Sequence, residues 1–255
     1  MLYEQLRYAE VVRKLYKLRH LLSHKAHPDI GSRVGYQKYS KQFYRIKKNL
    51  VKEGILDREG RFIENILNLW LVELPIDADS NQIKVLENRI PYTLFLSLCF
   101  DSPKKSGDLS KEFNLNRMSA YLAIEKLKKA GLIRSEDSAI VAPGGGVHRW
   151  LLRYLSLCKT HADTTGDISS LFNTVPAYIG GKQAYYMANY EPGRPVGPSD
   201  MTVITFRPFM KFWESAIKEI SYFRDYPKNV EITLAKPKDH IMWVDKLPYK
   251  KTRRA

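Results

Sequence analysis

The chain has 255 residues, more than a usual domain of about 100 to 200, so its length predicts two or three domains with enough chain to bury a core in each. Its 42 Lys and Arg residues outnumber its 27 Asp and Glu residues, and the net charge of +15 favours a polyanionic partner. A hydrophobic content of 44% excludes a disordered basic tail as the main body.

Cysteine content and hydropathy indicate where the chain functions. Cys99 and Cys158 have no CxxC partner, so the sequence predicts neither a disulfide framework nor a zinc knuckle, and a reducing compartment is expected. No run approaches the roughly 18 apolar residues of a membrane span, and residues 1–4 lack the order of a signal peptide. We expect a cytoplasmic protein that has no membrane partner and needs no cofactor.

The N-terminal segment, residues 1–36, predicts an amphipathic helix followed by a stretch broken by His, Pro and Gly. The apolar stripe of this helix consists of Val11, Leu15, Leu18 and Leu22. Its spacing of 4, 3 and 4 residues is that of a seam between paired helices, so we expect it to join two copies of the chain. The alternative is that the stripe packs as the first helix of its own domain.

Three histidines near the end of that helix have a spacing that metal ligands can use: His20, His24 and His27. On a continuous helix they would share one face. Pro28 and Asp29 indicate that the helix ends near the last of them, and no Cys or Glu completes the set. The sequence therefore predicts no metal site.

A weak repeat is the strongest internal signal. Residues 43–56 recur as residues 120–133, with Tyr, Leu, Lys and Gly in the same register. Each copy predicts a helix that stops at a glycine, Gly54 or Gly131, and then a short strand, a polar turn and a second strand. Helix, glycine stop and hairpin is the local plan of a winged helix.

The second copy also has the helices that precede such a unit. Residues 91–100 and 106–113 predict two helices, and Asn116 suits the N-cap of the third. The chain here resembles the winged helix-turn-helix family, which implies two DNA-binding units, in residues 1–74 and 81–143. The residues that would hold the turn and the third helix are Leu109, Leu115, Leu127, Gly131 and Leu132.

The helix of the first copy has a cationic face. With Phe43, Ile46 and Leu50 buried, the opposite face carries four cations at spacings of 4, 3 and 4. Like charges on one face repel one another, whereas DNA phosphates would bind them, so this face is predicted to contact DNA. The predicted contacts of the first unit, including its wing turn, are Lys38, Lys41, Tyr44, Arg45, Lys48, Lys52, Arg58 and Arg61.

The helix of the second copy is less basic on its outward face, where Met118, Leu122, Glu125 and Lys129 are expected. Exposed apolar residues at helical spacing more often mark packing against another domain or a second subunit. We therefore expect the main base-reading role in the first unit and a supporting or dimer-forming role in the second. The predicted DNA contacts of the second unit are Arg117, Ser119, Tyr121 and Lys126.

Residues 147–255 predict a third domain of the α/β type, because strands alternate with helices. The expected helices are 148–159, 167–172, 182–189 and 209–223. The expected strands are 177–179, 201–206, 229–235 and 240–244.

Two glycines that follow the first of these strands, and an acid that opens the next, resemble the nucleotidyltransferase fold. The resemblance implies glycines that admit nucleotide phosphates and two carboxylates at i and i+2 that hold Mg²⁺. Thr202 stands where the second carboxylate would be, so we expect a catalytically silent relative. The residues nominated for partner or nucleotide binding are Gly180, Gly181, Lys182, Asp200 and Glu231.

A winged helix followed by such a domain, together with Pro-Ala-Tyr-Ile-Gly at residues 176–180, resembles the antitoxin of abortive-infection toxin and antitoxin pairs. The resemblance implies that the N-terminal part binds promoter DNA and that the remainder neutralises a nucleotidyltransferase toxin.

The sequence thus predicts an α+β protein with two winged helix-turn-helix units and a C-terminal nucleotidyltransferase-like domain. We expect a homodimeric regulator that binds double-stranded DNA and is not an enzyme. Two alternatives remain open. One is a nucleotidyltransferase acting on RNA or protein, and the other is a plasmid replication or partition initiator that reads repeated sites with paired winged helices.

Overall fold

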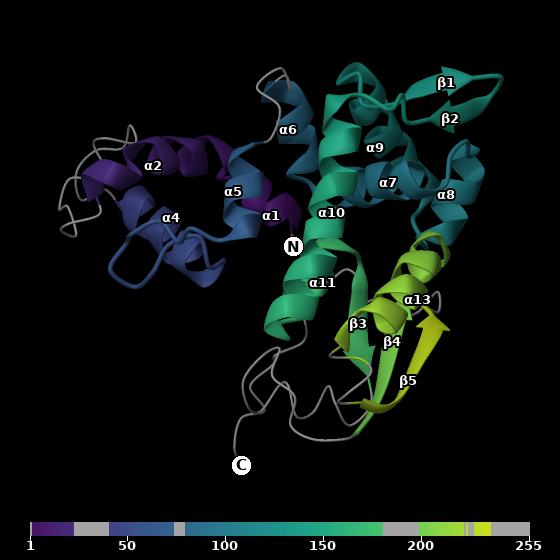
Figure 1. Cartoon of the computed structure of the whole chain (residues 1–255). Coiled ribbons are helices and arrows are strands. Elements are labelled where there is room, and N and C mark those ends of the chain that lie inside the picture. The colour runs from purple at the N-terminus through teal and green to yellow at the C-terminus, as the bar shows by residue number, and fades with distance from the viewer. Residues whose placement is uncertain are drawn as a thin grey trace, which may run out of the picture.

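The computed structural model describes residues 2–22, 41–73, 80–180, 199–221, 223 and 227–235. Over these residues the chain is mostly helical and has two small β-sheets, so the mixed α and β character predicted from the sequence is confirmed. None of the described helices is long and apolar enough to cross a membrane. Figure 1 shows three successive parts, which we call the first unit (2–73), the second unit (80–142) and the C-terminal unit (143–235).

The described helices of the first unit are α1 (Leu2–Leu6), α2 (Ala9–Leu22), α4 (Lys41–Lys52) and α5 (Ile66–Val72). After α4 the chain turns at Gly54, whose φ of 67° is the left-handed conformation that favours glycine. Leu56 and Phe62 then form one antiparallel bridge in place of the predicted pair of strands. The buried amide of Asn68 holds this hairpin by donating to the carbonyl oxygens of Gly54, at 3.0 Å, and Ile63, at 2.8 Å.

The apolar stripe of α2 faces the core of the chain itself. Val11 is 9% exposed and Leu15 is 1% exposed, and α2 packs against α5. The predicted seam between two copies is therefore wrong for these two residues, because the first unit already buries them. The side chains of Leu18 and Leu22 lie outside the described part of the chain.

The second unit consists of α6 (Ser80–Leu86), α7 (Arg89–Phe100), α8 (Ser106–Glu112), α9 (Arg117–Lys129), β1 (Arg134–Glu136) and β2 (Ala139–Val141). Both α7 and α8 pack on α9. Asn114, with a φ of 51°, forms the turn between α8 and α9. Asn116 caps α9, as predicted, because its side-chain oxygen accepts a hydrogen bond from the backbone N–H of Ser119 at 2.7 Å. The helix ends before Gly131, whose φ is 66°.

The segment between α7 and α8 adds a further strand position to the hairpin. Lys104 forms an antiparallel bridge with Ile140 of β2, with backbone hydrogen bonds of 3.0 and 2.7 Å. The side chain of Lys104 is buried, and its ammonium group lies 2.8 Å from Glu112 and 3.3 Å from Asp101. Because an isolated buried cation is costly, these carboxylates hold the segment where it crosses the hairpin.

The C-terminal unit consists of α10 (Gly146–Thr165), α11 (Ser169–Thr174), β3 (Ala177–Gly180), β4 (Ser199–Thr205), the 3-10 turn η1 (Arg207–Phe209), α13 (Met210–Glu219) and β5 (Pro227–Leu234). The sheet order is β3-β4-β5, with β3 antiparallel and β5 parallel to β4. Between β4 and β5 the chain buries Phe209 and Trp213. The predicted helix 182–189 and strand 240–244 lie outside the described residues.

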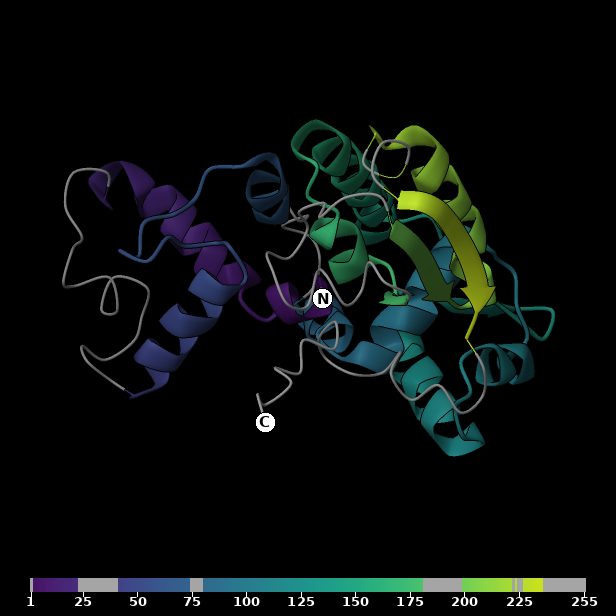
Figure 2. The same ribbon diagram turned by 90° about the horizontal axis from the view of Figure 1, so that it is seen from below.

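Helix α10 joins the first unit to the rest of the molecule. Figures 1 and 2 both show α2 and α4 as a lobe to one side. Trp70 of α5 and Trp150 of α10 form reciprocal hydrogen bonds, in which each indole N–H donates to the backbone carbonyl oxygen of the other residue, at 3.4 and 3.0 Å. On α1, the ring of Tyr3 lies 5.9 Å from the ring of Tyr92 in α7. The units therefore share packing contacts.

Candidate nucleic-acid interface

Helix α4 presents the cationic face that the sequence predicts. The helix holds five Lys and Arg residues and no acidic residue. Its inner side is fixed by Leu50, which is 2% exposed, and by Asn49, whose amide donates to the hydroxyl of Tyr8 at 2.7 Å. The predicted contacts on this helix are all exposed: Lys41, Tyr44, Arg45, Lys48 and Lys52.

The turn of the first hairpin carries two arginines, Arg58 and Arg61, which differ in their ion pairing within the turn. Arg58 is exposed. Arg61 is held inside the turn, with its Nε 2.6 Å from Asp57 and its Nη2 3.4 Å from Glu59. Burial alone would raise the pKa of Asp57, but hydrogen bonds from Arg61 and Gly60 and the charge of Arg61 lower it below its ordinary value. Both arginines are exposed, but the charge of Arg61 is paired within its own turn.

Helix α9 has the outward apolar residues that the sequence predicts. Met118 is 65% exposed and Leu122 is 51% exposed. Glu125 forms an ion pair with Lys128 at 3.5 Å. The predicted DNA contacts on α9 are exposed, apart from the half-buried Ser119: Arg117, Tyr121 and Lys126.

A cleft of about 560 Å³ is lined by residues of α8, α9 and the β1–β2 hairpin. It brings Arg117 and Tyr121 together with Lys128 from the same helix and Lys111 from α8. Neither Lys111 nor Lys128 is among the predicted contacts of the second unit. Lys128 follows Tyr121 by seven residues, a spacing that places both on one face of a helix, whereas Lys111 arrives only through the packing of α8. Serine side chains also line the cleft: Ser106, Ser110, Ser135 and Ser138.

Lys126 does not belong to this cleft. It follows Ser119 by seven residues, and both line a different hollow on the other side of α9, beside the amino end of α7. Lys126 lies nine residues, or about two and a half turns of helix, after Arg117, so it points to the opposite side of α9. The predicted contacts of the second unit are therefore divided between two opposite sides of α9.

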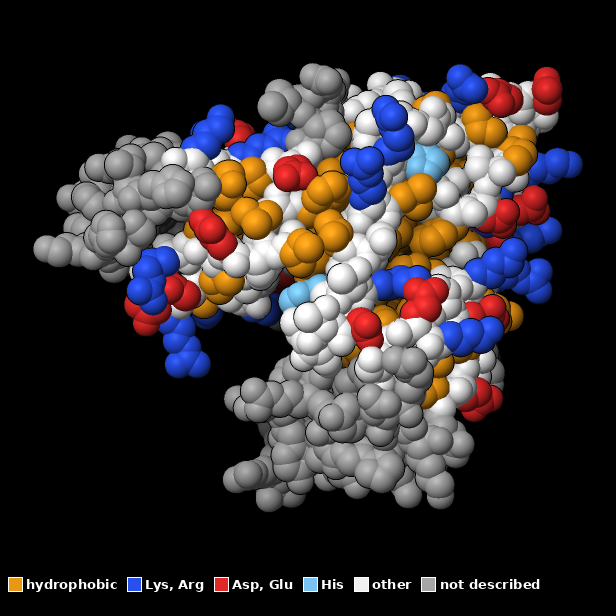
Figure 3. Space-filling view, in the orientation of Figure 1, with side chains coloured by type: hydrophobic (Ala, Val, Ile, Leu, Met, Phe, Trp, Pro, Cys, Tyr) orange, Lys and Arg blue, Asp and Glu red, His pale blue; other side chains and the backbone are white. Residues whose placement is uncertain are grey.

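The exposed cations form separate groups. In Figure 3, Lys and Arg side chains gather over the first unit and along the right-hand edge of the view, with Asp and Glu side chains among them.

The sheet of the C-terminal unit fixes the register of the residues nominated for nucleotide or metal binding. Thr202 of β4 pairs with Gly180 of β3 on one side and with Glu231 of β5 on the other. Asp200 pairs with Asn229. The strand position beside Glu231 is therefore held by a hydroxyl residue, while the acid of β4 lies two residues away.

Several nominated residues lie outside the described part of the chain: Lys38, His24, His27, Gly181 and Lys182. For His20 and Asp200 the backbone is described but the side chain is not. Among the described residues, no group of three or more His, Cys, Asp or Glu side chains is placed to hold a metal ion.

Comparison of the chain with protein-family models, with curated proteins and with solved structures finds no match.

Proposed function

We propose that the protein is a sequence-specific transcriptional regulator that binds double-stranded DNA through two winged helix-turn-helix units. The observation that carries the proposal is the exposed cationic face of α4. Four of its cations recur at spacings of 4, 3 and 4 residues and so follow one side of the helix for about 16 Å, at about 1.5 Å per residue. These residues are Lys41, Arg45, Lys48 and Lys52.

The energetics of that face favour a phosphate partner. Like charges at this helical spacing destabilise a helix by a few tenths of a kcal/mol per pair, so they contribute nothing to folding. On DNA the same charges replace condensed counterions, whose release into solvent favours binding. The major groove also admits an α-helix. The net charge of +15 attracts the polyanion over a longer range.

The order of elements in the second unit supports the winged-helix part of the proposal. Helices α7, α8 and α9 precede the β1–β2 hairpin, and Lys104 takes the third strand position beside Ile140. In helix-turn-helix proteins the second helix of the motif contacts DNA with its first residues. Arg117, exposed at the start of α9, would make such a contact. We assign α9 a supporting contact and α4 the main reading of base edges.

The proposed DNA-bound form is a homodimer, because one unit touches too few base pairs to select a site in a genome. With Val11 and Leu15 in the core, the proposed contact between copies moves to the outward face of α9 around Met118, which is 65% exposed. From the antitoxin resemblance, the C-terminal unit is proposed to bind a nucleotidyltransferase toxin and to have no enzymatic activity.

The salt dependence of DNA affinity tests the proposal. A duplex is first selected by the protein from fragmented genomic DNA, and its affinity is measured by fluorescence anisotropy between about 50 and 200 mM salt. The double variant Arg45→Ala with Lys48→Ala is expected to reduce the slope of log K against log salt by about 2, because each phosphate contact contributes about 0.9.

A second double variant provides a control with the same loss of charge. Lys211→Ala with Lys218→Ala removes two exposed cations from α13, outside both proposed DNA-contacting helices. The control is expected to keep the wild-type slope. An unchanged slope for the α4 variant, or an equal loss in both variants, would contradict binding through α4.

A further inference from the structure

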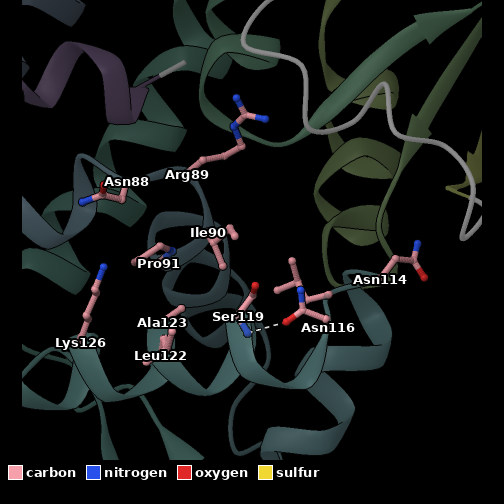
Figure 4. Close-up of a pocket in the computed structure, with 11 residues that line it drawn as sticks. Asn88, Arg89, Ile90, Pro91, Asn114, Asn116, Ser119, Leu122, Ala123 and Lys126 are labelled. Carbon is pink, nitrogen blue, oxygen red and sulfur yellow. Dashed lines mark hydrogen bonds between the residues drawn. The ribbon is translucent and has the colours of Figure 1, made fainter.

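A cavity of about 570 Å³ lies between the amino end of α7 and helix α9. Figure 4 shows Ile90 and Pro91 on the α7 side and Ser119, Leu122 and Ala123 on the α9 side. Its volume falls within the roughly 300 to 1,000 Å³ of sites that hold small molecules. Its apolar walls belong to two helices that pack against each other in the second unit.

One end of this cavity is electropositive. The exposed Lys126 extends from α9 toward Asn88, which precedes α7 (Figure 4). Asn88 makes no side-chain cap to α7, and its amide nitrogen donates backward to the carbonyl oxygen of Lys84 at 2.9 Å.

The backbone N–H groups of Arg89 and Ile90, which no side chain caps, add positive potential at this end, and Pro91 has no N–H to add. Arg89 points away from Lys126 (Figure 4), and its Nε donates to the hydroxyl of Tyr3 at 3.3 Å, so Lys126 supplies the side-chain charge at this end. None of the residues lining the cavity is acidic.

We propose that this cavity binds a small aromatic carboxylate. The aromatic ring would pack between Ile90 and Pro91 on one side and Leu122 on the other. This packing would remove apolar surface of the ring and of these side chains from contact with water. The carboxylate would lie at the end marked by Lys126 and the start of α7. A single negative charge complements this lining, whereas a cation would meet only like charge.

The position of the cavity links such a ligand to DNA binding. Ser119, Leu122 and Lys126 line the side of α9 opposite Arg117, which lines the cleft beside the hairpin. A bound carboxylate would place negative charge against α9 and repel DNA phosphates. We expect the ligand to weaken DNA binding. This consequence depends on the proposed function, whereas the binding site does not.

Binding is tested on the full chain without DNA, with naphthoate as the probe and isothermal titration calorimetry as the measurement. The wild type is expected to bind one naphthoate per chain saturably. Lys126→Gln is expected to weaken binding about fivefold, the effect of one solvent-exposed charge pair. Neutral naphthamide should bind the wild type more weakly by a similar factor. Ser119→Trp fills the cavity and is expected to abolish binding.

Two further variants keep the test decisive. Lys129→Gln removes a cation from the outward face of α9 that does not line the cavity, and it should leave naphthoate affinity unchanged. If circular dichroism shows Ser119→Trp to be unfolded, Lys126→Glu replaces it, since a reversed charge at an exposed position should abolish anion binding. No saturable binding to the wild type, or equal weakening by Lys126→Gln and Lys129→Gln, overturns the proposal.

DNA anisotropy with and without saturating naphthoate then tests the coupling. A loss of DNA affinity in the wild type that Ser119→Trp does not show supports the coupling. Naphthoate binding with unchanged DNA affinity overturns the coupling and leaves DNA binding intact. A chain that binds naphthoate but no DNA overturns the proposed function while supporting the cavity as a ligand site.

Discussion

Helices α4 and α9 occupy corresponding places in the two halves of the weak repeat, yet they expose different surfaces. Their inner sides are alike, since Leu50 of α4 and Leu127 of α9 are both buried. Their outer sides diverge, because α4 exposes cations without any acid, whereas α9 exposes Met118 and Leu122 beside its cations. The apolar residues of the repeat therefore determine how each helix packs, and the outward residues determine what each helix can bind.

The hairpins that follow these two helices differ in the contacts that hold them. The first is one bridge, held from α5 by the amide of Asn68. The second is a pair of strands, to which Lys104 adds a third strand position held by Glu112 and Asp101. The second unit therefore supports its hairpin mainly through β pairing and a buried ion pair, and the first unit through a side-chain amide.

The largest expected effect concerns burial in the two units. Leu15→Ala on α2 removes a side chain that is 1% exposed and should cost about 2 to 5 kcal/mol of unfolding free energy. Leu122→Ala on α9 removes a side chain that is 51% exposed and should change it by less than about 0.5 kcal/mol. Urea unfolding followed by circular dichroism measures both. If both variants changed the unfolding free energy by similar small amounts, Leu15 would be exposed in the single chain and the predicted seam between two copies would be supported.

The next effect compares the two DNA-contacting helices at equal loss of charge. Arg45→Ala with Lys48→Ala should reduce the salt slope by about 2. Arg117→Ala with Lys126→Ala should reduce it by about 1, because these residues lie on opposite sides of α9 and one duplex cannot contact both. The measurement is anisotropy on the same duplex. Equal reductions would show that DNA wraps around α9.

A smaller effect separates the two arginines of the first hairpin. Arg58→Ala should reduce the salt slope by about 1, as expected when one phosphate contact is lost. Arg61→Ala should reduce it less, because Asp57 and Glu59 already pair with this side chain. Parallel salt titrations of the two variants check the order. A larger effect of Arg61→Ala would mean that the turn opens on DNA.

The smallest expected effect concerns the turn of the second hairpin. Asp137 and Ser138 both have positive φ, at 44° and 66°, a conformation that is unfavourable for residues with a Cβ. Ser138→Gly should relieve part of this cost and stabilise the protein by about 0.5 kcal/mol. Thermal unfolding measures the change. A lower melting temperature would show that the side chain of Ser138 contributes more than its backbone costs.

The sequence predicted those features that a single residue or a short spacing determines. Gly54 and Gly131 mark where helices end because positive φ favours glycine. Asn116 was identified as a cap from its place before an apolar helix. The stripe of α2 shows the limit of such reasoning. The same spacing suits a seam between copies and a helix in a core, and only the packing of α5 on α2 separates them.

For the candidate sites, exposure was predictable and pairing was not. The sequence predicts that four cations of α4 lie opposite the buried Leu50, and these cations are exposed. The ion pair of Arg61 with Asp57 forms across a turn whose geometry the sequence leaves open. The bridge of Lys104 with Ile140 involves a single residue, so no alternation of apolar and polar residues in the sequence could indicate a strand there. The cavity between α7 and α9 joins Ile90 to Leu122, residues that only tertiary packing brings together.

The reciprocal hydrogen bonds of Trp70 and Trp150 would fix the spacing between the two DNA sites that α4 and α9 contact. These hydrogen bonds join α5 to α10. They restrict rotation of the first unit, which carries α4, relative to the second unit, which carries α9. A single duplex that met both helices would have to present its grooves at one rotational phase. Insertion of about five base pairs between the sites contacted by α4 and α9 would turn one site to the far side of the duplex and weaken binding. Insertion of about ten base pairs, one full turn of DNA, would bring the site back to the same side.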